Sequence, residues 1–262
     1  MPSDRPLTSF RALTFDCFGT LIDWEAGIYT ALAPLLARLP STHAFHTSRP
    51  AALKAFVAHE SRIQAEQPTL PYSALLSAAY ADLATADLAL DRPDEAECAA
   101  FGASVGLWPA FPDTVAALAR LRCRYRLVIL SNVDRASFGN TLAGPLEGTA
   151  FDAIYTAQDI GSYKPSPANF EFLVRKCGEE LGVAKEEILH TAQSLFHDHE
   201  PARKAGLVSA WIARGTAEGE VESIMGGKIE DFEGRVDITW RFASLGEMAD
   251  RVEEAFAKEG KA

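Results

Sequence analysis

The sequence predicts an α/β fold in which a parallel sheet carries a helical insertion after its first strand. Three observations predict it: short apolar runs that end at polar residues, helical patterns between these runs, and one long helical block that interrupts the alternation. Strands buried on both faces of a parallel sheet have nearly continuous apolar sequences. Alternating strands and helices imply parallel strands joined by right-handed crossovers.

Four short runs have the apolar, β-favouring character of buried strands. They are Arg11–Phe15, Arg126–Leu130, Glu187–Ala192 and Leu207–Ile212. Polar residues follow the first three runs closely, as Asp16, as Ser131-Asn132 and as the segment 194–198. Because ligands in open α/β sheets bind at the carboxyl ends of the strands, these polar groups are the candidates for a site.

Helix signals lie between the strand candidates. Asp113 and Thr114 are capping residues for a helix that would place Val115, Leu118 and Leu121 on one face. We therefore expect a helix between the first and second strands, with its apolar face on the sheet.

Two further helices are predicted in the second half of the chain. Ser166 and Pro167 form a start signal, and Phe170 continues an apolar stripe. Pro201 opens a shorter helix that Gly206 would close in a left-handed conformation.

The helical block divides the chain into a core of residues 1–22 and 109–262 and an insertion of residues 23–108. Helical patterns run from 51 to 64 and from 72 to 88 within it, and no strand signal is present. An insertion placed directly after the first strand would lie over that strand's carboxyl end, so we interpret it as a cap.

Composition excludes several classes of function. The 25 basic and 36 acidic residues give a net charge of −11, which disfavours binding to nucleic acids and to anionic membranes. No apolar run approaches the length of about 20 residues that a membrane span needs, and the N-terminus lacks the apolar stretch of a signal peptide. The four widely spaced cysteines are typical of reduced thiols, so we expect a cytoplasmic protein.

The polar residues that follow the strands could form a nucleophile and its support. Lys164, in the loop before the Pro167 helix, would keep the Asp16 carboxylate ionised and able to attack, and Thr20 could orient it with a hydrogen bond. Taken singly, an Asp, a Ser-Asn pair or a Lys-Pro pair after a strand is more commonly a turn or a cap. Their occurrence together, in this order, favours a catalytic site.

These residues resemble the four-motif signature of the haloacid dehalogenase superfamily. The motifs are Asp16-Cys-Phe-Gly-Thr-Leu-Ile-Asp23, Leu130-Ser-Asn132, Tyr163-Lys-Pro165 and Asp198. The resemblance covers the core, whereas the insertion matches only in its position and helical character. It implies a Rossmann-like core and a covalent intermediate on an aspartate nucleophile.

By the same resemblance, Asp16 is the nucleophile, Lys164 holds its charge, and Ser131 and Asn132 contact the substrate or intermediate. The backbone amide of Cys17 belongs to the anion-binding cradle, where its side chain is expected to pack rather than react. The expected substrate-binding residues are Cys17, Phe18, Thr20, Asn132 and Ser194.

Phe18 indicates the branch of the superfamily. Phosphatases of the superfamily carry an aspartate at this position to protonate the leaving alcohol, and loss of a general acid costs about 10²–10⁴-fold in rate. Halide leaves as a stable anion and needs no proton. The Asp-x-Phe-Gly-Thr pattern therefore resembles the L-2-haloacid dehalogenases, which attack the α-carbon of a 2-substituted acid and then hydrolyse the ester to a 2-hydroxy acid.

The last motif departs from that branch. Aligned on Asp198, Gln193 and Leu195 replace a serine and an asparagine that position water, and Phe170 replaces a tyrosine. We expect His197 or Asp198 to be the base that activates water.

The stretch of residues 197–200 also raises the question of a metal. His199 could equally be an exposed turn residue, and ligands adjacent in sequence at one turn rarely converge on one ion, so no dedicated metal site and no cofactor are expected. The aspartate that magnesium-dependent members of the superfamily carry near Ser194 is missing.

The cap positions leave alternatives open. Arg49 and Arg62 are the candidates for the arginine that gathers the substrate carboxylate, and Trp24 and Tyr72 could line an apolar pocket or simply pack. The expected partners are a small carboxylate and, as an open question, a second copy of the chain in a homodimer. The alternative functions are a divergent phosphatase and a binding protein that kept the fold with little turnover.

Overall fold

The computed structural model describes residues 5–214, 224 and 226–260. The chain forms two compact units. The first comprises Met1–Ile22, Ala110–Asn132 and Gly148–Ala262, and the second comprises Asp23–Pro109 and Val133–Glu147. The second unit thus holds the predicted insertion together with 133–147, a segment that the sequence had assigned to the core.

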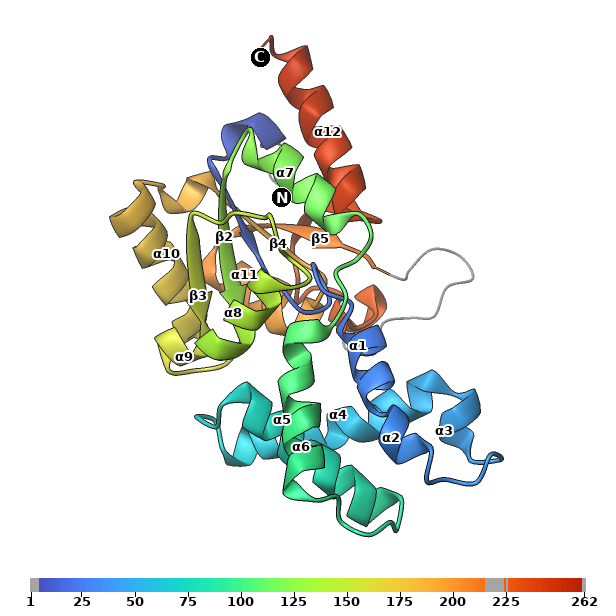
Figure 1. Cartoon of the computed structure of the whole chain (residues 1–262). Helices are drawn as coiled ribbons and strands as arrows, with labels where there is room; N and C mark the ends of the chain where they lie inside the picture. The colour runs from blue at the N-terminus through green and yellow to red at the C-terminus, as the bar shows by residue number, and fades with distance from the viewer. Residues whose placement is uncertain (1–4, 215–223, 225, 261–262) are drawn as a thin grey trace. The chain divides into compact units, whose positions relative to one another are not determined.

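A six-stranded parallel sheet, in the order β3-β2-β1-β4-β5-β6, forms the centre of the first unit (Figure 1). Its strands are β1 Ala12–Phe15, β2 Arg126–Ser131, β3 Ala153–Thr156, β4 Ile188–Ala192, β5 Val208–Ile212 and β6 Ile238–Phe242. The chain order reverses between β1 and β4, which pair directly. Such a reversal is where open α/β sheets bind ligands. The predicted α/β class is confirmed.

The two strands that the sequence did not indicate are those at the edges of the sheet. In β3 only Tyr155 and Thr156 are buried, and in β6 only Phe242 is buried. The four predicted strands are the central ones, and their observed ends lie within one residue of the predicted ends. An edge strand lacks a neighbour on one side, so its sequence does not need the continuous apolar run that reveals a central strand.

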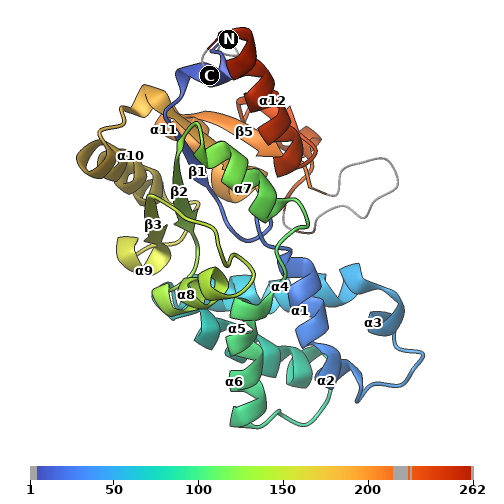
Figure 2. The same cartoon turned by 45° about the horizontal axis from the view of Figure 1, so that its top comes forward.

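The first unit also contains α7 Thr114–Arg122, α9 Ala157–Ile160, α10 Pro167–Leu181, α11 Glu200–Ala205 and α12 Leu245–Lys258. Helices α7 and α12 lie side by side on one face of the sheet, and α10 and α11 cover the other (Figures 1 and 2). As predicted, Pro167 opens α10, and Gly206 ends α11 with a φ of 69°.

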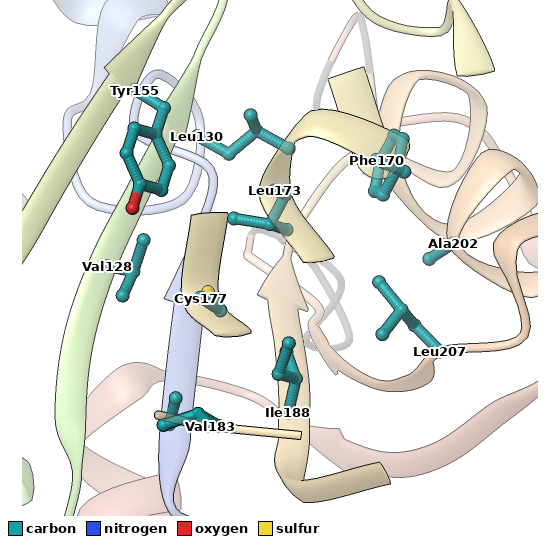
Figure 3. Close-up of a cluster of buried hydrophobic side chains, with 11 residues drawn as sticks. Val128, Leu130, Tyr155, Phe170, Leu173, Cys177, Val183, Ile188, Ala202 and Leu207 are labelled. Atoms are coloured by element: carbon teal, nitrogen blue, oxygen red, sulfur yellow. The ribbon is translucent and has the colours of Figure 1, made fainter. Parts of the chain in front are cut away.

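A buried apolar cluster joins α10 and α11 to the sheet (Figure 3). It consists of Ala12, Val128, Leu130, Tyr155, Phe170, Leu173, Cys177, Val183, Ile188, Ala202 and Leu207. Strand β2 contributes the alternate residues Val128 and Leu130, because side chains alternate across a strand, and β1 and β4 contribute Ala12 and Ile188. The cluster fixes the positions of the strand ends from which the site is built.

Helix α7 differs in detail from its prediction. Asp113 precedes it, but the Asp113 side chain makes no capping hydrogen bond. It accepts instead from Arg214 and from the backbone N–H of Gly246. Leu118 and Leu121 are buried as predicted, whereas Val115 is 39% exposed, so its assignment to the apolar face is wrong.

The second unit is helical throughout its regular structure, with no named strand among its residues, all of which the structure describes. Its helices are α1 Trp24–Ala31, α2 Ala33–Leu36, α3 Ala44–Thr47, α4 Arg49–Glu66, α5 Tyr72–Asp82, α6 Glu95–Ala103 and α8 Arg135–Ala143. In the described parts of the chain, no helix has both the length and the apolar character needed to traverse a bilayer.

Candidate active site

Strand β1 carries Asp16 to the carboxyl edge of the sheet. The Asp16 N–H still donates to the Thr191 carbonyl of the neighbouring strand, so its backbone is fixed as part of the ladder. The chain then turns sharply: the Cys17 carbonyl accepts from three following N–H groups, and Gly19 adopts a φ of 97°. A glycine suits this left-handed conformation because a Cβ would be strained there.

The Asp16 carboxylate is held at both oxygens. Lys164 Nζ donates to Oδ1 at 2.8 Å, and the Thr20 hydroxyl donates to Oδ2 at 2.8 Å. The Thr20 oxygen in turn accepts from the Gln193 N–H at 2.9 Å. Asp16 is only 7% exposed, so its orientation is set by these donors rather than by water. The structure thus brings together Asp16, Thr20 and Lys164, which the sequence placed in one site.

Lys164 lies at the centre of the site with all three ammonium protons used. They go to Asp16 Oδ1 at 2.8 Å, to Asp198 Oδ1 at 2.8 Å and to the Leu130 carbonyl at 3.0 Å. The side chain is buried. A buried ammonium is stable only with such partners, so its position is fixed.

Asn132 contacts the backbone of Lys164 at both polar atoms. Its Oδ1 accepts from the Lys164 N–H at 2.7 Å, and its Nδ2 donates to the Lys164 carbonyl at 3.0 Å. The paired bonds hold the lysine-bearing loop against the end of β2. The neighbouring Ser131 hydroxyl is buried and has no hydrogen-bond partner among the described residues.

Asp16 and Asp198 share one ammonium, and their pKa values are shifted in opposite directions. Burial raises the pKa of Asp16, with the charge of Asp198 adding to this and Lys164 and Thr20 opposing it. Burial acts in the same sense on Asp198, but Lys164 and His190 outweigh it and hold the pKa of Asp198 well below its usual range. The two carboxylates in turn outweigh burial and raise the pKa of Lys164.

The last motif forms a single π-helical turn, Leu195–His199. Ser194 precedes it, and its hydroxyl accepts from the His197 N–H at 3.1 Å and lies 3.2 Å from His197 Nδ1. Burial lowers the pKa of His197 to about 4, so this ring is neutral at neutral pH. Leu195 points into an apolar cluster with Trp211 and Phe232.

The expectation that His199 could be an exposed turn residue is wrong. His199 is fully buried, its Nε2 lies 2.9 Å from the Ala192 carbonyl, and its Nδ1 lies 2.8 Å from the Ser209 hydroxyl. Burial lowers its pKa to about 4. It is a structural histidine that ties the turn to β4 and β5.

Cys17 and Phe18, which follow Asp16 in the first motif, differ in burial. The Cys17 side chain is completely buried, and burial raises the pKa of its thiol, which makes it unreactive, as expected. Phe18 is only partly buried, and its backbone bridges to that of Ile22.

Two residues of the site were missed by sequence reasoning. His190, in the middle of β4, contacts Asp198 Oδ1 at 3.0 Å. Arg214, just after β5, donates to the Thr20 carbonyl at 3.1 Å and to Asp113 Oδ1 at 2.6 Å. A histidine inside an apolar strand was a signal that could have indicated the first, whereas nothing near Arg214 in the sequence indicates its partners.

Three of the four aromatic and basic candidates of the second unit have local partners within that unit. Arg49 lies 3.6 Å from Asp23 Oδ1, and Arg62 pairs with Glu66 and Asp82. Tyr72 and Trp24 are buried, and the Tyr72 hydroxyl donates to Glu60. Tyr72 therefore takes part in packing within the second unit. The pocket-lining role of Trp24 and the carboxylate-binding role of either arginine stay predictions.

The donor set does not fit a magnesium ion. Asp16 and Asp198, the two carboxylates that could bind one, both accept from the Lys164 ammonium. Ser194 offers a hydroxyl where magnesium-dependent members of the superfamily are expected to carry a further aspartate. Nor do three His, Cys, Asp or Glu side chains gather at metal-binding distance elsewhere in the described residues.

The chain is similar to known proteins in sequence pattern and in fold. Residues 10–206 match the family model described as haloacid dehalogenase-like hydrolase. A search of curated proteins finds no significant match.

Solved structures that resemble the chain include three L-2-haloacid dehalogenases. One superposes with a TM-score of 0.71 at 23% identity, covering 94% of this chain and 99% of the other. A defluorinating enzyme gives 0.70 at 20%, covering 97% and 100%. The enzyme of Xanthobacter autotrophicus gives 0.69 at 19%, covering 93% and 98%.

Proposed function

The chain belongs to the haloacid dehalogenase-like hydrolases, and from this membership we propose that it hydrolyses a small 2-substituted carboxylate through an ester on Asp16. The observation that carries the proposal is the Asp16 carboxylate, held at both oxygens by Lys164 and Thr20. Two residues further on, Phe18 cannot donate a proton. This combination suits displacement of a group that leaves as an anion.

The first step forms a carbon–oxygen bond between Asp16 and the α-carbon of the substrate. The carbon–halogen bond breaks, halide leaves with the electron pair, and the carbon is inverted. Water then attacks the aspartyl carbonyl, which releases a 2-hydroxy acid and regenerates the carboxylate. No step needs a metal, since Lys164 supplies the positive charge beside Asp16.

The second step needs a base for the proton of water, and we assign it to His197 rather than Asp198. Asp198 is a weak base because its pKa is held low between Lys164 and His190. Burial lowers the pKa of His197, but only to about 4, so its neutral ring is the stronger base of the two. An ester that accumulates on Asp16 in His197→Phe would support this role, and unchanged ester hydrolysis would contradict it.

The substrate class is supported by the similar structures, which are L-2-haloacid dehalogenases. At 23% identity or below they support the fold directly and the substrate only by analogy. A panel of 2-chloro- and 2-bromoacids of both hands, followed by halide release, tests the substrate.

Assays of halide release and of phosphate ester hydrolysis together separate this function from its alternatives. We expect halide release that survives a chelator, and negligible hydrolysis of p-nitrophenyl phosphate with or without magnesium. Robust magnesium-dependent phosphate release would replace the proposal with a phosphatase. Ligand binding without turnover of either class would identify a binding protein.

A further inference from the structure

His190 is a fully buried histidine that the two-step chemistry does not use. It lies in the middle of β4, on the face of the sheet that α10 covers, and the Phe170 ring packs edge-on against it with 5.2 Å between ring centroids. A polar ring inside an apolar cluster requires hydrogen-bond partners at both nitrogens. Its partners show what it does.

Both nitrogens of His190 are engaged. Nε2 lies 3.0 Å from Asp198 Oδ1, and Nδ1 lies 2.9 Å from the Thr14 hydroxyl. An ionised carboxylate can only accept, so the proton between His190 and Asp198 resides on Nε2. The carboxylate thus selects the tautomer, and Nδ1 then accepts from the Thr14 hydroxyl, which can serve as either donor or acceptor.

We propose that His190 is a positioning residue that holds Asp198 in place and thereby keeps the Lys164 ammonium shared with Asp16. The hydrogen bonds form one chain, from Thr14 through His190, Asp198 and Lys164 to Asp16. The inference rests on the proposed role of Asp16 as nucleophile.

The arrangement at Asp198 explains why a second donor matters. Both donors, Lys164 and His190, meet at Oδ1, while Oδ2 is buried without a hydrogen-bond partner among the described residues. Without His190, Lys164 would be the remaining donor to a buried charge. The ammonium would then be drawn toward Asp198 and away from Asp16, because the attraction grows as other compensation is removed.

Neither of the two other described side chains that contact His190 is placed to take over its role. Phe170 is the ring that covers His190, and it has no hydroxyl to donate. Thr14 contacts the far nitrogen of His190 rather than the carboxylate. The donor function is therefore specific to the imidazole at position 190.

Three variants separate positioning from simple packing. His190→Leu fills the space without a donor, and His190→Gln offers an amide N–H near the position of Nε2. His199→Leu is the matched control, because His199 is also fully buried but bonds to Ala192 and Ser209.

We expect His190→Leu to lower kcat about 10- to 100-fold with KM nearly unchanged, the loss typical of one hydrogen bond to a charge. His190→Gln should recover most of this loss, and His199→Leu should lower stability while largely keeping kcat. Equal kcat losses in His190→Leu and His199→Leu, or an unchanged kcat in His190→Leu, would overturn the proposal.

A readout without substrate keeps this inference separate from the proposed function. In protein labelled with ¹⁵N at histidine, the His190 ring should show a protonated Nε2 whose signal shifts in Asp198→Asn, with the His199 signals largely unmoved. A His190 ring insensitive to Asp198→Asn would overturn the positioning role even in an active enzyme. The expected shift in a protein that releases no halide would leave the network intact and reject only the proposed reaction.

Discussion

Two buried cations, Lys164 and Arg214, act on the same short loop after β1 in different ways. Lys164 binds the Asp16 carboxylate, whose other oxygen accepts from the Thr20 hydroxyl. Arg214 binds the Thr20 carbonyl and the Asp113 carboxylate, and its guanidinium stacks on the Phe111 ring at 4.0 Å. Both side chains are buried.

The difference lies in how the acids are compensated. Asp113 is held by Arg214 and by the Gly246 N–H, and despite its burial these partners lower its pKa. Lys164 must serve two carboxylates, and the pKa of one of them, Asp16, is raised. An acid whose charge is fully compensated stabilises a loop, whereas an acid whose compensation is shared retains the reactivity of a nucleophile.

The largest effect on turnover should come from substitution of Asp16, the acid that shares the Lys164 ammonium with Asp198. Asp16→Asn keeps the shape of the side chain but replaces the proposed nucleophile with a neutral amide, so we expect turnover to fall by about 10⁴-fold or more. A single turnover in ¹⁸O-labelled water, with enzyme in excess, should place the label in Asp16 and leave the product unlabelled. Immediate label in the product, together with substantial activity in Asp16→Asn, would exclude the covalent route.

The next effect concerns the shared ammonium. Lys164→Met should lower kcat by about 10²-fold or more and destabilise the fold by roughly 3–5 kcal/mol, because two buried carboxylates would lose the cation that they share. Halide release and urea unfolding measure the two losses.

Lys176→Met is the control for the loss of a lysine charge. Lys176 pairs with Glu180 on the surface of α10, so its loss should change the free energy of unfolding little and leave activity unchanged. Similar stability losses in the two variants would contradict a central role for Lys164.

The sequence predicted most of the residues that gather around Lys164. Asp16, Lys164 and Asp198 follow short apolar strands or stand in a recognisable loop, and parallel strands bring such residues to one edge. The central strands were predicted for the same reason. The edge strands β3 and β6 were missed because partial exposure removes the continuous apolar run.

The contacts of Arg214 could not be predicted, because they join distant parts of the chain. Asp113 has the sequence context of a helix cap, and only the fold brings Arg214 and Gly246 to its carboxylate. His190 was hidden for a related reason. Its strand was predicted, but the face that a strand residue occupies, and hence its contact with Asp198, depends on tertiary packing.

Arg214 should affect stability more than catalysis. Arg214→Gln should lower the free energy of unfolding by about 3 kcal/mol, since it leaves Asp113 without its cation, and kcat should fall about tenfold or less through Thr20. Arg214→Lys restores the charge but not the planar fork or the stack on Phe111, so it should recover little stability. Urea unfolding and halide release test this, and a kcat loss as large as that of Lys164→Met would remove the distinction between the two cations.

The smallest effect comes from a buried base that has no carboxylate. His199 bonds to a backbone carbonyl and a hydroxyl, and burial lowers its pKa to about 4, against an ordinary value of 6.5. Protonation therefore favours the unfolded chain. The stability contributed by the neutral ring is complete above about pH 6.5 and is lost as the pH falls toward 4.

The pH dependence of unfolding isolates this histidine. His199→Gln can still donate to the Ala192 carbonyl but does not titrate, so between pH 7 and 4.5 it should lose about 2 kcal/mol less stability than the parent protein. Urea titrations of both proteins at the two pH values measure the difference, and the acids with lowered pKa, Asp113 and Asp198, contribute equally to both. Parallel losses in the two proteins would mean that His199 is protonated in the fold. His199 would then be a third buried cation beside Lys164 and Arg214, and the inference that its buried ring is neutral would be wrong.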